Sequence, residues 1–89
     1  MPELIHRHSA NVVTASGTAY QAVIYGEERA DGTWTAWIEF VPLAGGPELR
    51  TGSETSQPDR AAVEYWASGL EPLYLDGAFE RALRTRPDA

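Results

Sequence analysis

Two β-rich runs meet at the pair Asp31-Gly32, and this arrangement limits the possible folds more than any other part of the sequence. Residues 17–28 (GTAYQAVIYGEE) and residues 33–41 (TWTAWIEFV) are both rich in the aromatic and β-branched side chains that are typical of strands. Gly32 can supply the positive φ that a tight turn between two strands requires. The sequence therefore predicts an antiparallel β-hairpin.

The side chains of the second run alternate between the two faces of the predicted strand. One face holds Trp34, Ala36, Ile38 and Phe40, and the other holds Thr33, Thr35, Trp37 and Glu39. We expect Trp34 to pack in the core under a helix. Trp37 is either an isolated surface aromatic residue or an anchor for a partner, because tryptophan is enriched at interface hot spots. Since the two indoles point to opposite faces, they cannot form one stacking platform for single-stranded nucleic acid.

Two further strands are expected to flank the hairpin. Residues 4–14 are expected to add an N-terminal edge strand, with Val12 and Val13 as the best strand candidates. Pro42 ends the second run because proline cannot donate a ladder hydrogen bond. After a loop, residues 48–51 are expected to form a third short strand of the hairpin sheet.

Two helices are expected in the second half of the chain. The first is predicted at residues 57–68, with Ser56 as N-cap, Pro58 in the first turn and Gly69 as its stop. The second is predicted within residues 72–86 (PLYLDGAFERALRTR). Its large apolar side chains recur every four residues, as in an amphipathic helix: Leu75, Phe79 and Leu83.

The apolar stripe of this C-terminal helix needs a surface to pack on. Either the helix folds back over the free face of the sheet and covers Trp37, or it packs against a second subunit in a two-fold dimer. We favour the dimer. The sequence as a whole predicts one α+β domain over residues 1–89, in which a small antiparallel sheet of three to four strands is packed by one helix and followed by a C-terminal helix at residues 72–86.

The charge of the chain narrows the possible partners. The formal net charge is −6, and all seven basic residues are arginine. Because nucleic-acid affinity depends on cationic neutralisation of phosphates, we expect no direct binding of nucleic acid and a basic protein as the partner. The absence of cysteine removes thiolate catalysis and cysteine-ligated zinc, and it fits a reducing compartment. No apolar run approaches the roughly 20 residues that span a bilayer, so we expect a cytoplasmic protein without a membrane anchor.

The residues that could carry catalysis or hold a metal have simpler interpretations. His6 and His8 lie two apart on one strand face but lack a third ligand, so we interpret them as solvated side chains near the terminus. A catalytic carboxylate pair is not indicated among Glu54, Asp59 and Glu64, because the last two lie about 140° apart around a helix. Three arginines are expected to complement a helix dipole rather than to bind phosphate: Arg81, Arg84 and Arg86. We therefore expect no catalytic residue, no metal and no cofactor.

The order of several short motifs resembles that of the HicB antitoxin family. These motifs are Tyr20, Ala22-Val23-Ile24, Asp31-Gly32, Trp34-Thr35-Ala36, Pro42 and Thr51-Gly52-Ser53-Glu54-Thr55, followed by a helix. The resemblance covers residues 17–70, which we take as a HicB-like core, and it leaves residues 72–86 where many members carry a DNA-binding domain. It implies a three-stranded antiparallel sheet packed by a helix, a partial ribonuclease-H-like module without catalytic residues that binds and silences a small basic RNA-cleaving toxin.

The sequence and the resemblance together predict a non-catalytic protein-interaction module. The partner-binding residues are expected on the hairpin: Glu27, Glu28, Asp31, Glu39 and Trp37. The acids would attract a basic partner, since charge complementarity accelerates and orients association. The alternative is a self-associating domain with a structural or small-ligand role and no toxin partner, which an apolar pocket in the structure would favour.

Overall fold

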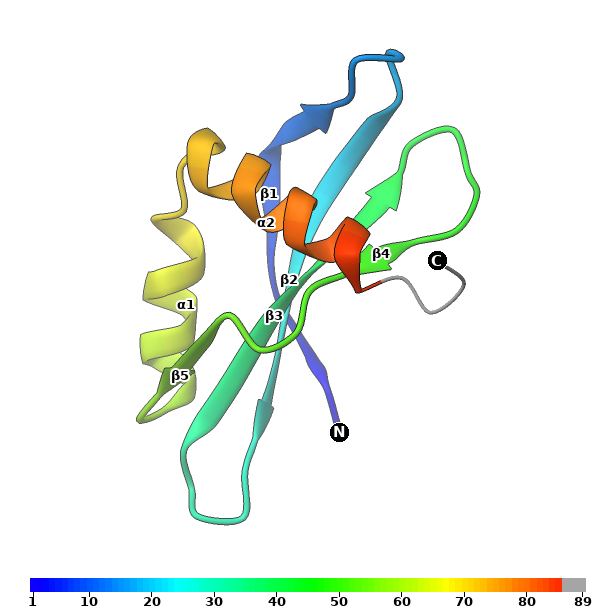
Figure 1. The fold of residues 1–89 in the computed structure, drawn as a ribbon. Coiled ribbons are helices and arrows are strands. Elements are labelled where there is room, and N and C mark those ends of the chain that lie inside the picture. The colour runs from blue at the N-terminus through cyan, green and yellow to red at the C-terminus, as the bar shows by residue number, and fades with distance from the viewer. Residues whose placement is uncertain (86–89) are drawn as a thin grey trace.

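The computed structural model describes residues 1–85, and these form a single sheet with two helices (Figure 1). The elements follow in the order β1 (Glu3–Val13), β2 (Ala19–Glu28), β3 (Trp34–Pro42), β4 (Leu49–Arg50), β5 (Thr55–Gln57), α1 (Arg60–Ser68) and α2 (Pro72–Arg84). The antiparallel sheet has the order β1-β2-β3-β4, and the short β5 also pairs with β3. The predicted α+β fold class is therefore confirmed. Within residues 1–85, no helix is long and apolar enough to cross a membrane.

The β2–β3 hairpin is the centre of the sheet, and it forms where Asp31-Gly32 predicts it. Its register runs without a break from Tyr20 opposite Pro42 to Glu28 opposite Trp34. Gly32 has a φ of 88°, and its amide donates to the Arg29 carbonyl at 2.9 Å. A side chain with a Cβ would be strained at that φ, so glycine is the residue that suits this turn.

The core lies between one face of the sheet and the two helices. Trp34, Ala36, Ile38 and Phe40 of β3 all belong to it, and Trp34 is 8% exposed. The predicted core position of Trp34 is thus confirmed. α1 contributes Val63 and Ala67, and α2 contributes Leu75, Ala78, Phe79 and Ala82.

α2 does not lie over the free face of the sheet, so the first of its two predicted placements is wrong. α2 packs on the same face as α1 and crosses in front of β2 and β3 in Figure 1, so it does not cover Trp37. The ring of Phe79 lies 4.9 Å from that of Tyr20 and 5.2 Å from that of Phe40. At the end of the helix, the Thr85 hydroxyl donates to the Arg50 carbonyl of β4 at 2.7 Å. The predicted dimer stays a prediction, but Leu75 and Phe79 of the apolar stripe on which it rested are buried within the chain.

The first helix begins later than predicted. Residues 55–57 form β5, which pairs Thr55 with Ala36 and Gln57 with Trp34. Asp59, rather than Ser56, is the N-cap, and its carboxylate accepts a hydrogen bond from the Ala62 amide at 2.8 Å. Ser56 and Gln57, which the sequence places at the start of the helix, therefore pair with β3 instead. Gly69 is the C-cap, as predicted.

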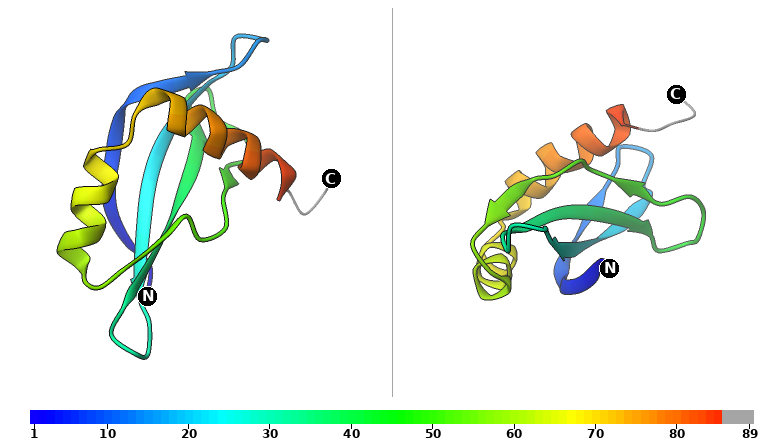
Figure 2. Two further views of the ribbon diagram at one scale, coloured as in Figure 1. Left: turned by 60° about the vertical axis from the view of Figure 1, so that its left-hand side comes forward. Right: turned by 90° about the horizontal axis from the view of Figure 1, so that it is seen from below.

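The two flanking strands are found where the sequence predicts them. β1 is an edge strand that pairs with β2, with register shifts between Leu4 and His6 and between Arg7 and Asn11. β4 occupies two of the residues predicted at 48–51. The end of the predicted C-terminal helix, at residue 86, lies outside the described residues. α1 and α2 meet at an angle and form a corner (Figure 2).

Candidate protein-interaction surface

Three of the five predicted partner-binding residues lie at the turn end of the β2–β3 hairpin. Glu28 and Asp31 are exposed and Glu27 is half-buried. Glu27 lies opposite Thr35 and Glu28 opposite Trp34, so the two neighbours point to different faces of the sheet. The terminal amino group of Met1 lies 3.0 Å from the Glu27 carboxylate.

Asp31 both shapes the turn and carries charge on it. One of its carboxylate oxygens accepts from the Thr33 hydroxyl at 2.6 Å and from the Thr33 amide at 2.9 Å. These hydrogen bonds, the hydroxyl first, lower the pKa of Asp31 below its usual value. The carboxylate is therefore a fixed negative charge at the tip of the hairpin.

Trp37 and Glu39 lie on the other face of β3, which we call the outer face. The Trp37 ring stacks beside that of Tyr25 at 6.5 Å, and the Arg50 guanidinium lies over it at 4.5 Å. Its indole nitrogen donates to Glu39 at 3.0 Å. Trp37 is on the predicted face but is only 5% exposed, so the expectation of a surface indole is wrong. Its neighbours on the outer face cover it.

The five predicted residues thus form two groups and not one patch. Glu39 is four residues along β3 from Thr35, the partner of Glu27. At the rise of a strand, this separation is about 13 Å. A partner that contacts both groups would have to lie along the length of the hairpin.

A polar network that the sequence does not predict ties α2 to the loop before β5. The Glu54 carboxylate accepts from the Tyr74 hydroxyl at 2.6 Å and from Arg81 at 3.0 and 2.6 Å. The Glu54 side chain is 7% exposed, whereas that of Arg81 is 40% exposed. Arg81 therefore serves as the partner of a buried carboxylate. The network joins residues 27 positions apart, which no local sequence signal connects.

The network shifts the pKa values of its members. Burial alone would raise the pKa of Glu54, but the hydrogen bonds from Arg81 and Tyr74 outweigh it and leave this pKa below its usual value. Burial, followed by the hydrogen bond to Glu54, raises the pKa of Tyr74 to about 12. Glu54 is thus held as a carboxylate and Tyr74 as a neutral phenol, a pairing that stabilises the fold.

The other predicted chemical groups do not converge. Asp59 caps α1, and Glu64 pairs with Arg60 one turn away. Arg84 lies in the last turn of α2, as predicted, and Arg86 lies outside the described residues. Asp59 and Glu64 therefore make separate structural contacts and do not share one site.

The rings of the two histidines of β1 lie side by side. The ring centroids of His6 and His8 are 5.9 Å apart, in an edge-to-face arrangement. The Nε2 of His8 lies 2.8 Å from the Leu70 carbonyl, to which it donates. Residues 1–85 contain no group of three side chains that could hold a metal ion. The interpretation of His8 as a solvated side chain is wrong, because it links β1 to the corner between the helices.

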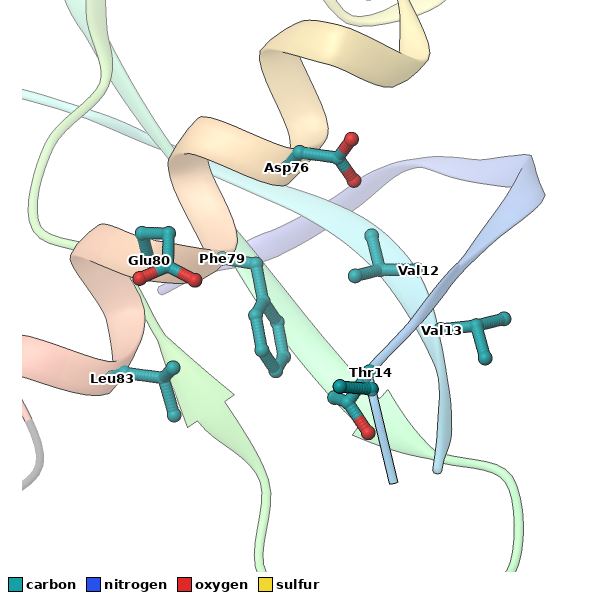
Figure 3. Close-up of a pocket in the computed structure, with 8 residues that line it drawn as sticks. Val12, Val13, Thr14, Asp76, Phe79, Glu80 and Leu83 are labelled. Carbon is teal, nitrogen blue, oxygen red and sulfur yellow. The ribbon is translucent and has the colours of Figure 1, made fainter. Parts of the chain in front are cut away.

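Hollows with apolar side chains lie at two places on the described surface that bear on ligand binding. The first, of about 340 Å³, lies between the end of β1 and α2 (Figure 3) and is lined by Val12, Val13, Thr14, Ala15, Asp76, Phe79, Glu80 and Leu83. The second, of about 410 Å³, lies at the corner between the helices and is lined by Gly69, Leu70, Glu71, Leu73 and Tyr74. Both combine apolar side chains with at least one carboxylate.

No protein-family model, curated protein or solved structure matches this chain.

Proposed function

We propose that this protein is a non-catalytic interaction module that binds a small basic protein, in the manner that its resemblance to HicB antitoxins implies. The observation that carries the proposal is the acidic turn end of the hairpin. Glu28 and Asp31 are exposed there, and within residues 1–85 neither has a cationic group within 4.0 Å. On a chain with a net charge of −6, these exposed acids would attract and orient a basic partner.

The outer face would extend this contact along the hairpin. Trp37 lies between Tyr25 and Arg50 and donates a hydrogen bond to Glu39. These contacts already restrict the rotamers of the three neighbouring side chains, so little side-chain entropy is left to lose on binding. Ordered side chains cost less entropy when a partner docks. Trp37 would then act by positioning Tyr25 and Glu39 for the partner.

The contacts of the reactive side chains support a non-catalytic role. The Glu54 carboxylate already accepts hydrogen bonds from Arg81 and Tyr74. The imidazole of His8 is bonded to a carbonyl, and the Ser53 hydroxyl is 2.6 Å from that of Thr35. General acid–base catalysis needs such groups within reach of a substrate in a common cleft.

The proposed location is the cytoplasm, which a chain without cysteine fits.

Capture by the tagged protein from a lysate of its source cells tests the proposal. The test variant neutralises four acids with their closest neutral analogues: Glu27→Gln, Glu28→Gln, Asp31→Asn and Glu39→Gln. Asn at position 31 keeps an oxygen that can accept the turn hydrogen bonds of Thr33. The control variant has the same net charge but changes four acids elsewhere: Glu3→Gln, Glu48→Gln, Glu64→Gln and Glu71→Gln.

We expect the wild-type protein and the control variant to retain a small basic protein that the hairpin variant loses. Equal retention by both variants would refute the hairpin as the binding surface. Equal loss from both would show that only net charge matters, which also contradicts the proposal.

Self-association is the second candidate, and the corner between the helices favours it. Leu73 is 82% exposed there, beside Tyr74, which is 37% exposed. Contiguous exposed apolar side chains mark surfaces that another chain can cover, whereas isolated ones are ordinary. Recovery of the tagged protein only with untagged copies of itself would support this alternative.

A further inference from the structure

The hollow between the end of β1 and α2, which we call the α2 groove, combines an apolar floor with two acids. Figure 3 shows Phe79 and Leu83 on α2 facing the strand that carries Val12 and Val13. Phe79 is 6% exposed and belongs to the core, whereas Val13 is 63% exposed. The groove therefore opens from the core to an apolar side chain at the surface.

Both acids of the α2 groove come from one face of α2. Asp76 and Glu80 are four residues apart, one helical turn, and both are exposed. Like charges at this spacing repel each other and destabilise a helix. In the described part of the chain, no cationic group lies within 4.0 Å of either carboxylate, and Arg81 is committed to Glu54.

A ligand for this groove must satisfy both parts of it. Its charged end must be cationic to relieve the repulsion between Asp76 and Glu80. Its stem must be apolar to cover Phe79, Leu83 and Val13. Arginine and lysine side chains have this build, because an aliphatic stem carries the charged head. A volume of about 340 Å³ is at the lower end of the range for small-molecule sites.

We propose that the α2 groove binds an arginine or lysine side chain of the protein's basic partner, with the stem along Phe79 and the head at Asp76 and Glu80. The inference rests on the proposed function, because it takes the partner to be basic. It adds a second contact, made by α2, to the one at the hairpin. Arginine suits the groove better than lysine, since its guanidinium presents five N–H donors in a planar fork that matches a carboxylate.

A peptide titration followed by two-dimensional NMR tests the α2 groove without the partner. The probe is an acetylated and amidated peptide, Ac-Ala-Leu-Arg-Ala-Leu-Arg-NH2, and its control replaces arginine by the neutral isostere citrulline. The test variant is Asp76→Asn with Glu80→Gln. The matched variant, Glu48→Gln with Glu64→Gln, has the same net charge. The spectrum of each variant also shows whether it is folded.

We expect saturable shifts of the backbone amides of Thr14, Phe79 and Leu83 with the arginine peptide and none with the citrulline peptide. The groove variant should weaken the fitted affinity about fivefold, as expected for two exposed charge pairs, and the matched variant less than about twofold.

Three results would overturn the inference, and they are separable from a failure of the proposed function. Shifts confined to the hairpin amides would refute the α2 groove and leave the hairpin surface intact. Equal binding of the citrulline peptide, or no saturable shift at any amide, would also refute it. Capture of a basic partner decides the proposed function independently, because that experiment changes Glu28 and Asp31 and leaves the α2 groove unaltered.

Discussion

Replacing Glu54 by alanine should detach the polar anchor of α2 and lower the melting temperature by about 10 °C. The carboxylate is 7% exposed and accepts three hydrogen bonds, from Tyr74 and twice from Arg81. A hydrogen bond to a charged group contributes about 1.5–3 kcal/mol when it is buried. Here Arg81 is 40% exposed and Tyr74 is 37% exposed, so both donors can bind water after the substitution, and we expect a total loss of about 2 kcal/mol. For a domain of this size, 1 kcal/mol corresponds to about 4–8 °C.

Thermal unfolding followed by circular dichroism measures this effect. The matched control is Glu64→Ala, which removes an exposed ion pair with Arg60 and should cost less than about 1 kcal/mol. Equal melting temperatures for the two variants would refute the role of Glu54 as an anchor.

The pH dependence of stability provides a second measure of the same network. The pKa of Glu54 in the folded protein is below its usual value of 4.5, so the folded state favours the carboxylate. The resulting stability is present above about pH 4.5 and is lost as the pH falls through the lower pKa of the folded state. We expect the stability of the wild-type protein to fall more steeply than that of Glu54→Ala below about pH 4.5. Parallel curves would contradict this assignment.

Two further predictions concern the helices, and urea denaturation tests both. Phe79→Ala should lower the free energy of unfolding by about 3–5 kcal/mol, because the ring packs against Tyr20 and Phe40 in the core. The control Leu73→Ala, at an exposed position, should change it by less than about 0.5 kcal/mol. Similar losses for the two variants would contradict the packing of α2 on the sheet. Asp59→Ala should lower the free energy of unfolding by about 1 kcal/mol through loss of the N-cap, and Asp59→Asn should retain most of that stability. An alanine variant as stable as the wild type would show that α1 is not capped by Asp59.

The hairpin could be predicted because its signals are local. Alternation fixes the face of each β3 side chain, and Gly32 fixes the turn, so both Trp34 and Trp37 lie on the predicted faces. The exposure of Trp37 could not be predicted in the same way. Tyr25 and Arg50 come from neighbouring strands, and a pattern within one strand does not contain their positions.

The errors in the second half of the chain share a cause, which is competition from distant partners. Ser56 and Asp59 are both good N-cap residues, and pairing of Thr55 and Gln57 with β3 decides between them. The apolar stripe of α2 predicts an amphipathic helix but not the surface that it covers. Hydrophobic periodicity does not predict the Glu54–Arg81 ion pair either, because the pair joins a loop to a helix.

The central claim, that the acidic hairpin binds a basic protein, is tested most directly by quantitative capture with wild-type protein, the hairpin variant and the charge-matched control at low and high salt. We predict a small basic protein in stoichiometric amount with the wild type and the control, lost at high salt because screening weakens exposed charge pairs, and absent from the hairpin variant. Capture of the same protein by the hairpin variant, or recovery of the wild type with itself alone, would contradict the claim.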